Sequence, residues 1–124
     1  MMVNQRITDL RKVINIPNHF NPGILGILIY EPYMRKQYYM DSLKYFTNIE
    51  IKQAIVFTDN PTIAKKYLCY SIIESNNTID EFLKICMCEH LIIDKSQYAY
   101  LAAILNPNKD KIIVHPGDID LIIT

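Results

Sequence analysis

Hydrophobic and polar positions follow two alternating patterns from about residue 24 onward. Short, almost wholly apolar runs such as residues 24–29, 54–58 and 91–93 are typical of strands buried on both faces of a sheet. The segments between them carry apolar residues at helical spacing, for example Tyr39 and Leu43. Because strands that alternate with helices form parallel sheets, we expect an α/β fold. The prediction is a single Rossmann-like three-layer domain with a mainly parallel sheet of about five strands.

The predicted elements divide the chain at regular intervals. Strands are expected at residues 24–29, 54–58, 70–73, 91–93 and 111–115. Helices are expected at residues 36–48, 61–68, 79–87 and 98–105. Residues 1–21 should hold one helix plus a loop, and residues 119–123 could add an edge strand. Since there is no internal repeat, low-complexity tract or linker, we interpret residues 1–124 as one domain.

Capping signals mark the starts of three helices. Asn60 stands at a favourable N-cap position with Pro61 at the first helical position. Thr78 and Glu81 have the spacing of a capping box. Ser96 should cap the last helix. From the helix after Thr78, the residues expected to face the core are Ile79, Phe82, Leu83 and Met87.

Composition narrows the functional classes. A chain of 124 residues is long enough for one domain with a buried core. Lys plus Arg equals Asp plus Glu at 13 each, so no net field favours nucleic acid or an anionic membrane. No apolar run approaches the roughly 20 residues of a membrane span, and the start lacks the apolar core of a signal peptide. We therefore expect a cytoplasmic chain with no nucleic-acid or membrane partner.

In an open parallel sheet, ligands bind beyond the carboxyl ends of the strands, where loops and helix N-termini converge. The polar residues that follow the predicted strands are Tyr30, Glu31, Asp59, Asn60, Glu74, Ser75, Asp94, Ser96 and His115. Free N–H groups at the three capped helix starts would suit a phosphate group. Capping and turn formation are nevertheless the commoner roles for such residues.

Other kinds of site find little support. The three glycines cannot form a Gly-x-Gly-x-x-Gly or a phosphate-binding loop. Cys86, Cys88 and His90 do not have the spacing of a usual zinc site, so we expect no metal. The three cysteines are an odd number, which indicates reduced thiols rather than a disulfide framework. Ser96 lies on no nucleophile-elbow pattern, and a lone His115 is more often structural.

Several segments, in their order and spacing, resemble the family 11 glycosyltransferases, the α-1,2-fucosyltransferases. These segments are Tyr38-Tyr39, residues 54–60, Asp80-Glu81-Phe82, residues 88–93, residues 102–106 and residues 111–116. The similarity covers about residues 24–116 and only the donor-binding, C-terminal half of such enzymes. It implies one half of a GT-B-type fold that binds GDP-fucose without a metal and passes fucose to a galactoside hydroxyl.

By the same resemblance, the residues near the donor would be Asp59, Asn60, Ser96 and Tyr98. Asp59 matches the family's Ser-Asp-Asp element, and Ser96 matches the first Ser of its Asn-Ser-x-Phe-Ser-Trp-Trp element. In the second element Tyr98 stands for the Phe and Ala99 for the second Ser. Tyr100 and Leu101 stand for the two Trp, so this element has fewer polar groups than in the family.

The largest departure follows the first strand, where the family has His-x-Arg-Arg-Gly-Asp-Tyr. Here Ile29 and Tyr30 stand in place of the two arginines, and Glu31 would repel a phosphate. An arginine pair neutralises the departing diphosphate, so its loss should cost several kcal/mol in the transition state, about a thousandfold in rate. Arg35 or Lys36 could substitute as a phosphate-binding cation.

The sequence therefore predicts a fucosyltransferase-like domain that is truncated and catalytically impaired. A non-catalytic module that binds a nucleotide, a glycan or a protein is the alternative. A third interpretation is a chance resemblance on an unrelated flavodoxin-like domain, which a different strand order would support. If the absent half leaves apolar surface exposed, self-association would cover it, so we also expect a homodimer.

Overall fold

The structure is a computed structural model, and it describes residues 16–69, 72–76 and 78–117. The strands are β1 (Asn21–Ile29), β2 (Gln53–Thr58), β3 (Ile72–Glu74), β4 (Cys88–Ile92) and β5 (Ile113–Val114). The helices are α2 (Lys36–Leu43), α3 (Pro61–Tyr67), α4 (Ile79–Cys86) and α5 (Gln97–Leu105), with a 3-10 turn η1 (Lys44–Phe46) after α2. The expectations for residues 1–15 and 119–123 lie outside the described residues, as do Tyr70 and Ser71 of the third predicted strand.

The five strands form one parallel sheet in the order β3-β2-β1-β4-β5. The predicted α/β class and the single Rossmann-like domain are therefore confirmed. This order is that of dinucleotide-binding domains and differs from the 2-1-3-4-5 order of flavodoxin-like domains, which speaks against the flavodoxin-like interpretation. The order reverses between β1 and β4, so the carboxyl ends of these two strands mark the point at which such sheets bind ligands.

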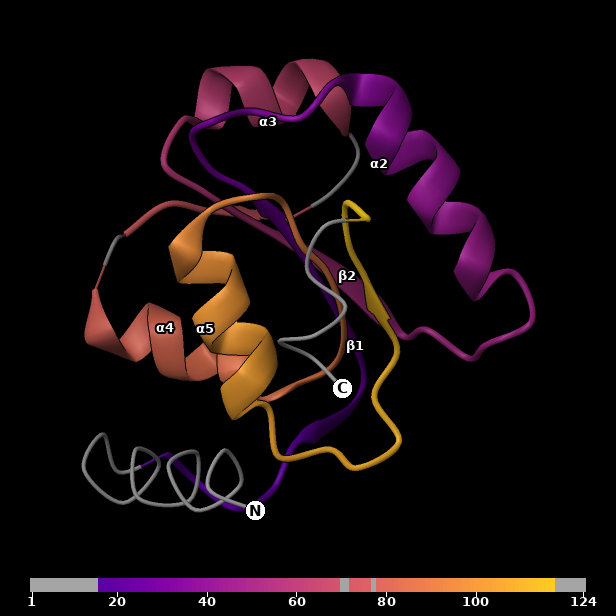
Figure 1. The fold of residues 1–124 in the computed structure, drawn as a ribbon, viewed down its shortest axis with the longest axis vertical. Coiled ribbons are helices and arrows are strands. Elements are labelled where there is room, and N and C mark those ends of the chain that lie inside the picture. The colour runs from indigo at the N-terminus through magenta and orange to yellow at the C-terminus, as the bar shows by residue number, and fades with distance from the viewer. Residues whose placement is uncertain (1–15, 70–71, 77, 118–124) are drawn as a thin grey trace.

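Helices cover both faces of the sheet, which gives three layers (Figure 1). On one face, Leu28, Phe57 and Leu91 pack with side chains of α4 and α5, among them Ile85 and Ala102. All five of these residues are fully buried or nearly so. Truncating a buried aliphatic side chain of this kind to Ala typically costs about 2–5 kcal/mol, so this face contributes much of the stability.

The second face of the sheet packs against α2, η1 and α3. Ile27 and Val56 of the central strands lie in one apolar cluster with Tyr39 of α2, Phe46 of η1 and Ala64 of α3. Because successive side chains of a strand point to opposite faces, β1 and β2 are apolar at nearly every position, as the continuous runs in the sequence predict. The predicted helix at residues 36–48 is a true helix only as far as Leu43 and then tightens into η1.

The edge strand β5 is shorter than predicted, with two residues in place of the expected 111–115. Side chains from the preceding loop account for the difference. The Asn106 Nδ2 donates to the Cys88 carbonyl at 2.6 Å, and the Asn108 Nδ2 donates to the Glu89 carbonyl at 2.8 Å. These bonds occupy carbonyl groups at the start of β4. Regular pairing with β4 therefore begins only at Ile113.

All three predicted helix caps are present. The Asn60 Oδ1, Thr78 Oγ1 and Ser96 Oγ each accept a hydrogen bond from a backbone N–H three residues further on. The reciprocal half of the capping box is not formed, because the Glu81 carboxylate accepts from the Asn76 N–H at 2.7 Å. Accordingly, α4 is rotated so that Glu81 is buried.

This rotation makes the prediction of a buried Ile79 wrong, because that side chain is 62% exposed. The buried face of α4 is formed instead by Glu81, Phe82, Ile85 and Cys86. Phe82 is buried as expected, whereas Leu83 and Met87 are only half-buried.

Candidate functional site

Asp94 joins the carboxyl ends of β1 and β4, where the strand order reverses. One carboxylate oxygen accepts from the Tyr30 N–H at 2.6 Å, and the other accepts from the Ser96 N–H at 2.8 Å. The Asp94 side chain is fully buried. Burial raises its pKa, although the hydrogen bonds from Ser96 and Tyr30 act in the opposite direction. At the point where the strand order reverses, both carboxylate oxygens of Asp94 are therefore occupied by hydrogen bonds within the protein.

Asp59 extends the site along the end of β2. Its Oδ1 accepts from the Tyr33 hydroxyl at 2.9 Å, and its Oδ2 accepts from the Glu31 N–H at 3.3 Å. Partial burial and the hydrogen bond to Asp59 raise the pKa of Tyr33. The negative charge of Asp59 also contributes to the raised pKa of Asp94, so the two carboxylates lie close enough to interact. The loop after β1 is thus fastened to the end of β2.

Tyr30 points away from this edge into the layer formed by α4 and α5. Its ring is 6% exposed and lies 4.9 Å from the ring of Tyr98, measured between centroids. Its hydroxyl donates to the Glu81 Oε1 at 3.3 Å. Burial is the main cause of its raised pKa, and the charge of Glu81 adds to it. Tyr30 therefore anchors α4 to β1 from within the core.

Tyr98 lies between Tyr30 and Phe82, with its ring centroid 5.1 Å from that of Phe82. Its hydroxyl is buried and has no well-aligned hydrogen-bond partner among the described residues. Burial, with the charge of Glu81, raises the pKa of Tyr98 to about 12, although the interaction of its hydroxyl with that of Tyr30 acts in the opposite direction. The structure thus places the predicted donor-binding Tyr98 in the aromatic layer behind the edge.

The other predicted donor-binding residues lie in loops at the carboxyl edge. Asp59 and Asn60 connect β2 to α3, and Ser96 connects β4 to α5. The Asn60 Oδ1 is occupied by the Ile63 N–H at 3.3 Å, and the Ser96 Oγ is occupied by the Ala99 N–H at 3.1 Å. Ser96 is also only 8% exposed. Two of these three side chains therefore already serve helix caps.

The predicted phosphate-binding cations, Arg35 and Lys36, stand at the start of α2. Both are exposed, and neither forms an ion pair within the described parts of the chain. They follow β1 and its loop, so they lie at the same carboxyl edge of the sheet as Asp59 and Asp94. The carboxyl edge therefore carries the exposed Asp59 carboxylate together with these two cations.

Ile29 and Tyr30, the two positions that the predicted resemblance aligns with arginines, present no side chain to the edge. Ile29 is fully buried in the layer that contains Tyr39, and Tyr30 is buried in the opposite layer. Neither side chain could supply a cation, and Glu31 beside them is exposed. At the carboxyl end of β1, the interior is therefore apolar, and the exposed side chain is acidic.

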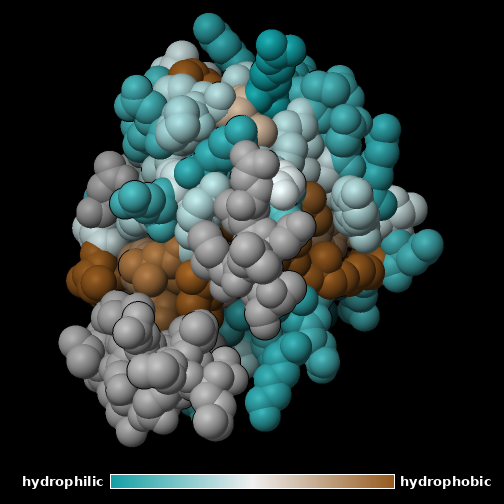
Figure 2. All heavy atoms as spheres, in the orientation of Figure 1, coloured by the Kyte–Doolittle hydropathy of each residue, from teal (hydrophilic) through white to brown (hydrophobic). Residues whose placement is uncertain are grey.

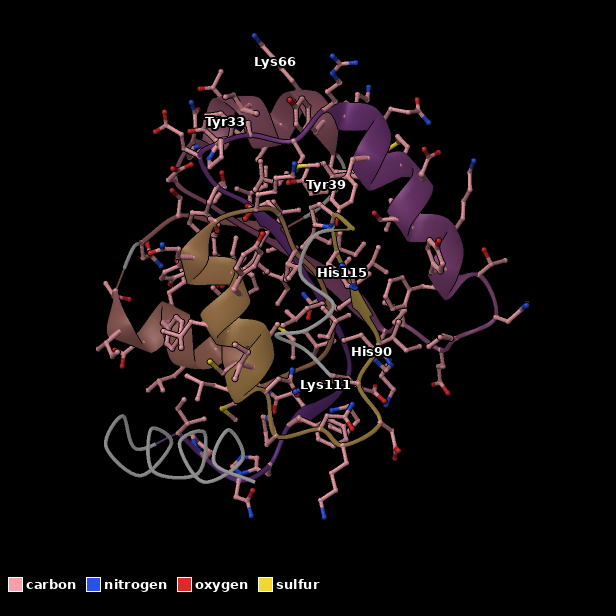
Figure 3. The ribbon with its side chains drawn as sticks, viewed as in Figure 1. Tyr33, Tyr39, Lys66, His90, Lys111 and His115 are labelled. Atoms are coloured by element: carbon pink, nitrogen blue, oxygen red, sulfur yellow. The ribbon has the colours of Figure 1, made fainter. Side chains whose placement is uncertain are left out.

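The remaining strand ends carry polar residues with local roles. Glu74, the last residue of β3, forms an ion pair with Lys84 of α4 at 2.6 Å. His115, after β5, has its Nδ1 3.0 Å from the Pro116 carbonyl oxygen. Figure 3 shows Tyr33 close to α3 at one end of the molecule and His115 nearer its middle, beside β5. The structure does not bring Tyr33 and His115 into one constellation.

Sequence reasoning missed the two residues on which this arrangement depends most, Asp94 as a bridge and Glu81 as a buried acceptor. The sequence identifies Asp94 only as a residue after a strand, because its partner Tyr30 is 64 residues away. The sequence places Glu81 in a capping box, whereas its contact with Tyr30 spans 51 residues. An acidic residue directly after a buried apolar run was the one available signal.

The described residues contain no cluster of three or more His, Cys, Asp or Glu side chains that could hold a metal ion. Cys86 and Cys88 are buried, and burial raises the pKa of the Cys88 thiol to about 12.

No helix in residues 16–69, 72–76 and 78–117 is long and apolar enough to cross a membrane. The surface over α3 is largely hydrophilic in the view of Figure 2.

The fold and the strand-end site define the chain as a single Rossmann-like α/β domain. Comparison of the sequence with models of known protein families finds no match, and comparison with curated proteins finds none either.

Proposed function

We propose that this chain is a fucosyltransferase-like domain, related to the donor-binding half of the family 11 enzymes, that does not transfer fucose. One observation carries the proposal: Ile29 and Tyr30 are both part of the core, on opposite faces of the sheet. The backbone N–H of Tyr30 is also bonded to the buried Asp94. At the position where such an enzyme needs cations, the two side chains are therefore buried, and the backbone N–H of Tyr30 is occupied by the Asp94 carboxylate.

Transfer from GDP-fucose requires that charge on the departing diphosphate be neutralised. A preorganised donor aimed at a developing negative charge is worth about 3–4 kcal/mol, a factor of 10² to 10³ in rate. At this edge Asp59 and Glu31 have the opposite effect on the same charge. Arg35 and Lys36 are exposed side chains on long flexible stems, so they supply a screened attraction rather than a fixed clamp.

Nucleotide binding makes smaller demands than transfer. The N-terminus of α5 retains backbone N–H groups that can face a phosphate, although the Ser96 Oγ competes for the Ala99 N–H. Arg35 and Lys36 add a diffuse positive charge nearby. The proposal therefore includes weak binding of GDP or GDP-fucose at this edge, without a metal and without turnover.

Calorimetric titration of the purified chain with GDP and GDP-fucose, beside ADP and UDP, tests the proposed relationship. We expect the guanine nucleotides to bind at least about tenfold more tightly than ADP and UDP, a difference of about 1.4 kcal/mol. The R35A/K36A double variant should bind all four nucleotides more weakly than the wild type does. K66A is the matched control, because Lys66 is also exposed and lies on α3.

A second candidate function is a protein-binding module on the same fold. The exposed apolar side chains of Ile72 on β3 and Ile79 on α4, 50% and 62% exposed, favour it. Absence of nucleotide binding at millimolar concentration would contradict the proposed donor relationship and would favour this second function.

A further inference from the structure

His90 lies at the seam between β4 and β5 and is almost completely buried. It is 5% exposed, its partner in β1 is Leu25, and its ring centroid is 5.7 Å from that of Phe46 in η1. Its Nδ1 accepts a hydrogen bond from the backbone N–H of Ile112 at 2.9 Å. A histidine side chain thus takes the acceptor role that a strand carbonyl would otherwise have.

Hydrogen bonds at both ends of β5 add to its short parallel ladder with β4. In addition to the bond to His90, the Leu91 N–H donates to the Ile112 carbonyl at 3.1 Å, and the Ile93 N–H donates to the Val114 carbonyl at 2.9 Å. The Tyr38 hydroxyl lies within reach of the Ile93 and Val114 carbonyl oxygens. Because β5 has only two residues, its own ladder is short, and the bonds at its ends, including that to His90, add substantially to its hydrogen bonding with β4.

The hydrogen bond determines the protonation state of His90. An imidazole nitrogen that accepts from a backbone N–H must carry no proton, so the ring is neutral with its proton on Nε2. A second proton would be added at Nδ1, where it would face the Ile112 N–H. Two donors cannot share this position, so the protonated ring must lose the bond.

The surroundings of His90 favour the neutral ring. η1 presents Phe46 and β1 presents Leu25, neither of which carries charge, and the segment before β5 presents the Ile112 backbone. The acidic group that acts on the ring is Glu89 of β4, whose Oε2 is 3.7 Å from Nε2. Burial lowers the pKa of His90 below its ordinary value, and the charge of Glu89 opposes this only in part.

We infer that His90 is a pH-sensitive latch: protonation breaks its hydrogen bond from Ile112 and releases the β5 edge, with the following His115, from the sheet. The latch is closed at neutral pH. Since the folded protein binds this proton less readily than the open form, the closed state loses stability as the pH falls below about 6.5. The population with β5 released should rise by up to about tenfold for each pH unit until the folded protein itself takes up the proton.

Hydrogen exchange of the Ile112 amide, followed by NMR between pH 7.5 and pH 5 and corrected for the intrinsic rate, tests this inference. Protection of Ile112 should fall several-fold more than that of the Leu68 and Tyr100 amides, whose acceptors are backbone carbonyls within helices. Equal protection at both pH values, after correction, would overturn it.

The H90N variant separates the latch from general acid sensitivity. The Asn Oδ1 stands near the position of Nδ1 and can accept from Ile112, but it does not titrate, so protection should become independent of pH. H19N is the matched control, because His19 is exposed and should leave the wild-type response unchanged. A pH response that persists in H90N would contradict the inference.

A ¹⁵N titration of the wild-type histidine rings tests the inference without a variant. The expected result is a neutral His90 ring with its proton on Nε2 and a midpoint below 6.5 that coincides with the loss of Ile112 protection. A ring with its proton on Nδ1, or a midpoint above 6.5, would overturn it.

Discussion

Substitutions of Tyr30 and Tyr98 test whether Tyr30, the residue directly after β1, is part of the hydrogen-bonded core. Both phenols are packed in the same aromatic layer, and their ring centroids are 4.9 Å apart. The Tyr30 hydroxyl donates to Glu81, whereas the Tyr98 hydroxyl is buried without a well-aligned partner among the described residues. Y30F and Y98F therefore remove the same atom from two different hydrogen-bonding situations.

The expected effects on stability have opposite signs. A hydrogen bond to a charged group contributes about 1.5–3 kcal/mol, and at 3.3 Å the bond from Tyr30 should lie near the low end, at about 1.5 kcal/mol. The Tyr98 hydroxyl interacts with that of Tyr30 but makes no well-aligned hydrogen bond among the described residues, so removing it should range from neutral to stabilising by about 1 kcal/mol. The two variants should therefore differ by roughly 2 kcal/mol in their free energy of unfolding.

Urea unfolding at neutral pH measures the difference directly, provided that the dependence of the free energy on urea concentration is the same for both variants. For a domain of this size, roughly 2 kcal/mol corresponds to a separation of about 8 °C in Tm. Introducing Y30F into an E81Q background should cost less than in the wild type, because the acceptor is then neutral. If Y30F and Y98F are equally destabilising, the two hydroxyls share one network and the assigned role of Tyr30 is wrong.

Three further predictions concern packing, thiols and assembly. G26A should destabilise the fold by about 1–3 kcal/mol in urea unfolding, because an added Cβ would lie 2.7 Å from Leu91 Cδ2 and 2.8 Å from Cys88 Sγ; an unchanged midpoint would show that the neighbours yield freely. Of the described cysteines, a disulfide reagent at neutral pH should modify exposed Cys69 first, and reach Cys86 and Cys88 only in denaturant; rapid native labelling of Cys88 would contradict its burial and raised pKa. The homodimer expected from the sequence should appear as twice the chain mass in sedimentation equilibrium at micromolar concentration, whereas a monomeric mass would count against it.

Much of the fold follows from local chemistry that the sequence displays. The apolar runs predict β1, β2 and β4 because strands buried on both faces have no polar side to interrupt them. Asn60 and Ser96 predict helix starts because a short polar side chain satisfies an N–H of the first turn without help from the rest of the fold. Such signals depend on neighbours within four residues.

The features that sequence reasoning missed depend on distant partners. Ile79 is exposed because α4 turns to place Glu81 against Tyr30, a contact that no helical periodicity encodes. β5 is short because Asn106 occupies a carbonyl of β4, 18 residues earlier in the chain. At the site, Asp59 and Asp94 were found by their positions after strands. Their hydrogen bonds to the β1 loop required the three-dimensional arrangement.

The measurement that tests the central claim most directly is product formation from GDP-fucose and a galactoside acceptor, with an active family 11 enzyme assayed in parallel. Because Ile29 and Tyr30, which the proposed relationship aligns with arginines, both lie in the core, we expect no fucosylated product above the enzyme-free blank when the parallel enzyme reaches completion. Fucosylated product that disappears in the R35A/K36A variant would contradict the account, because it would show that these exposed cations replace the missing arginines.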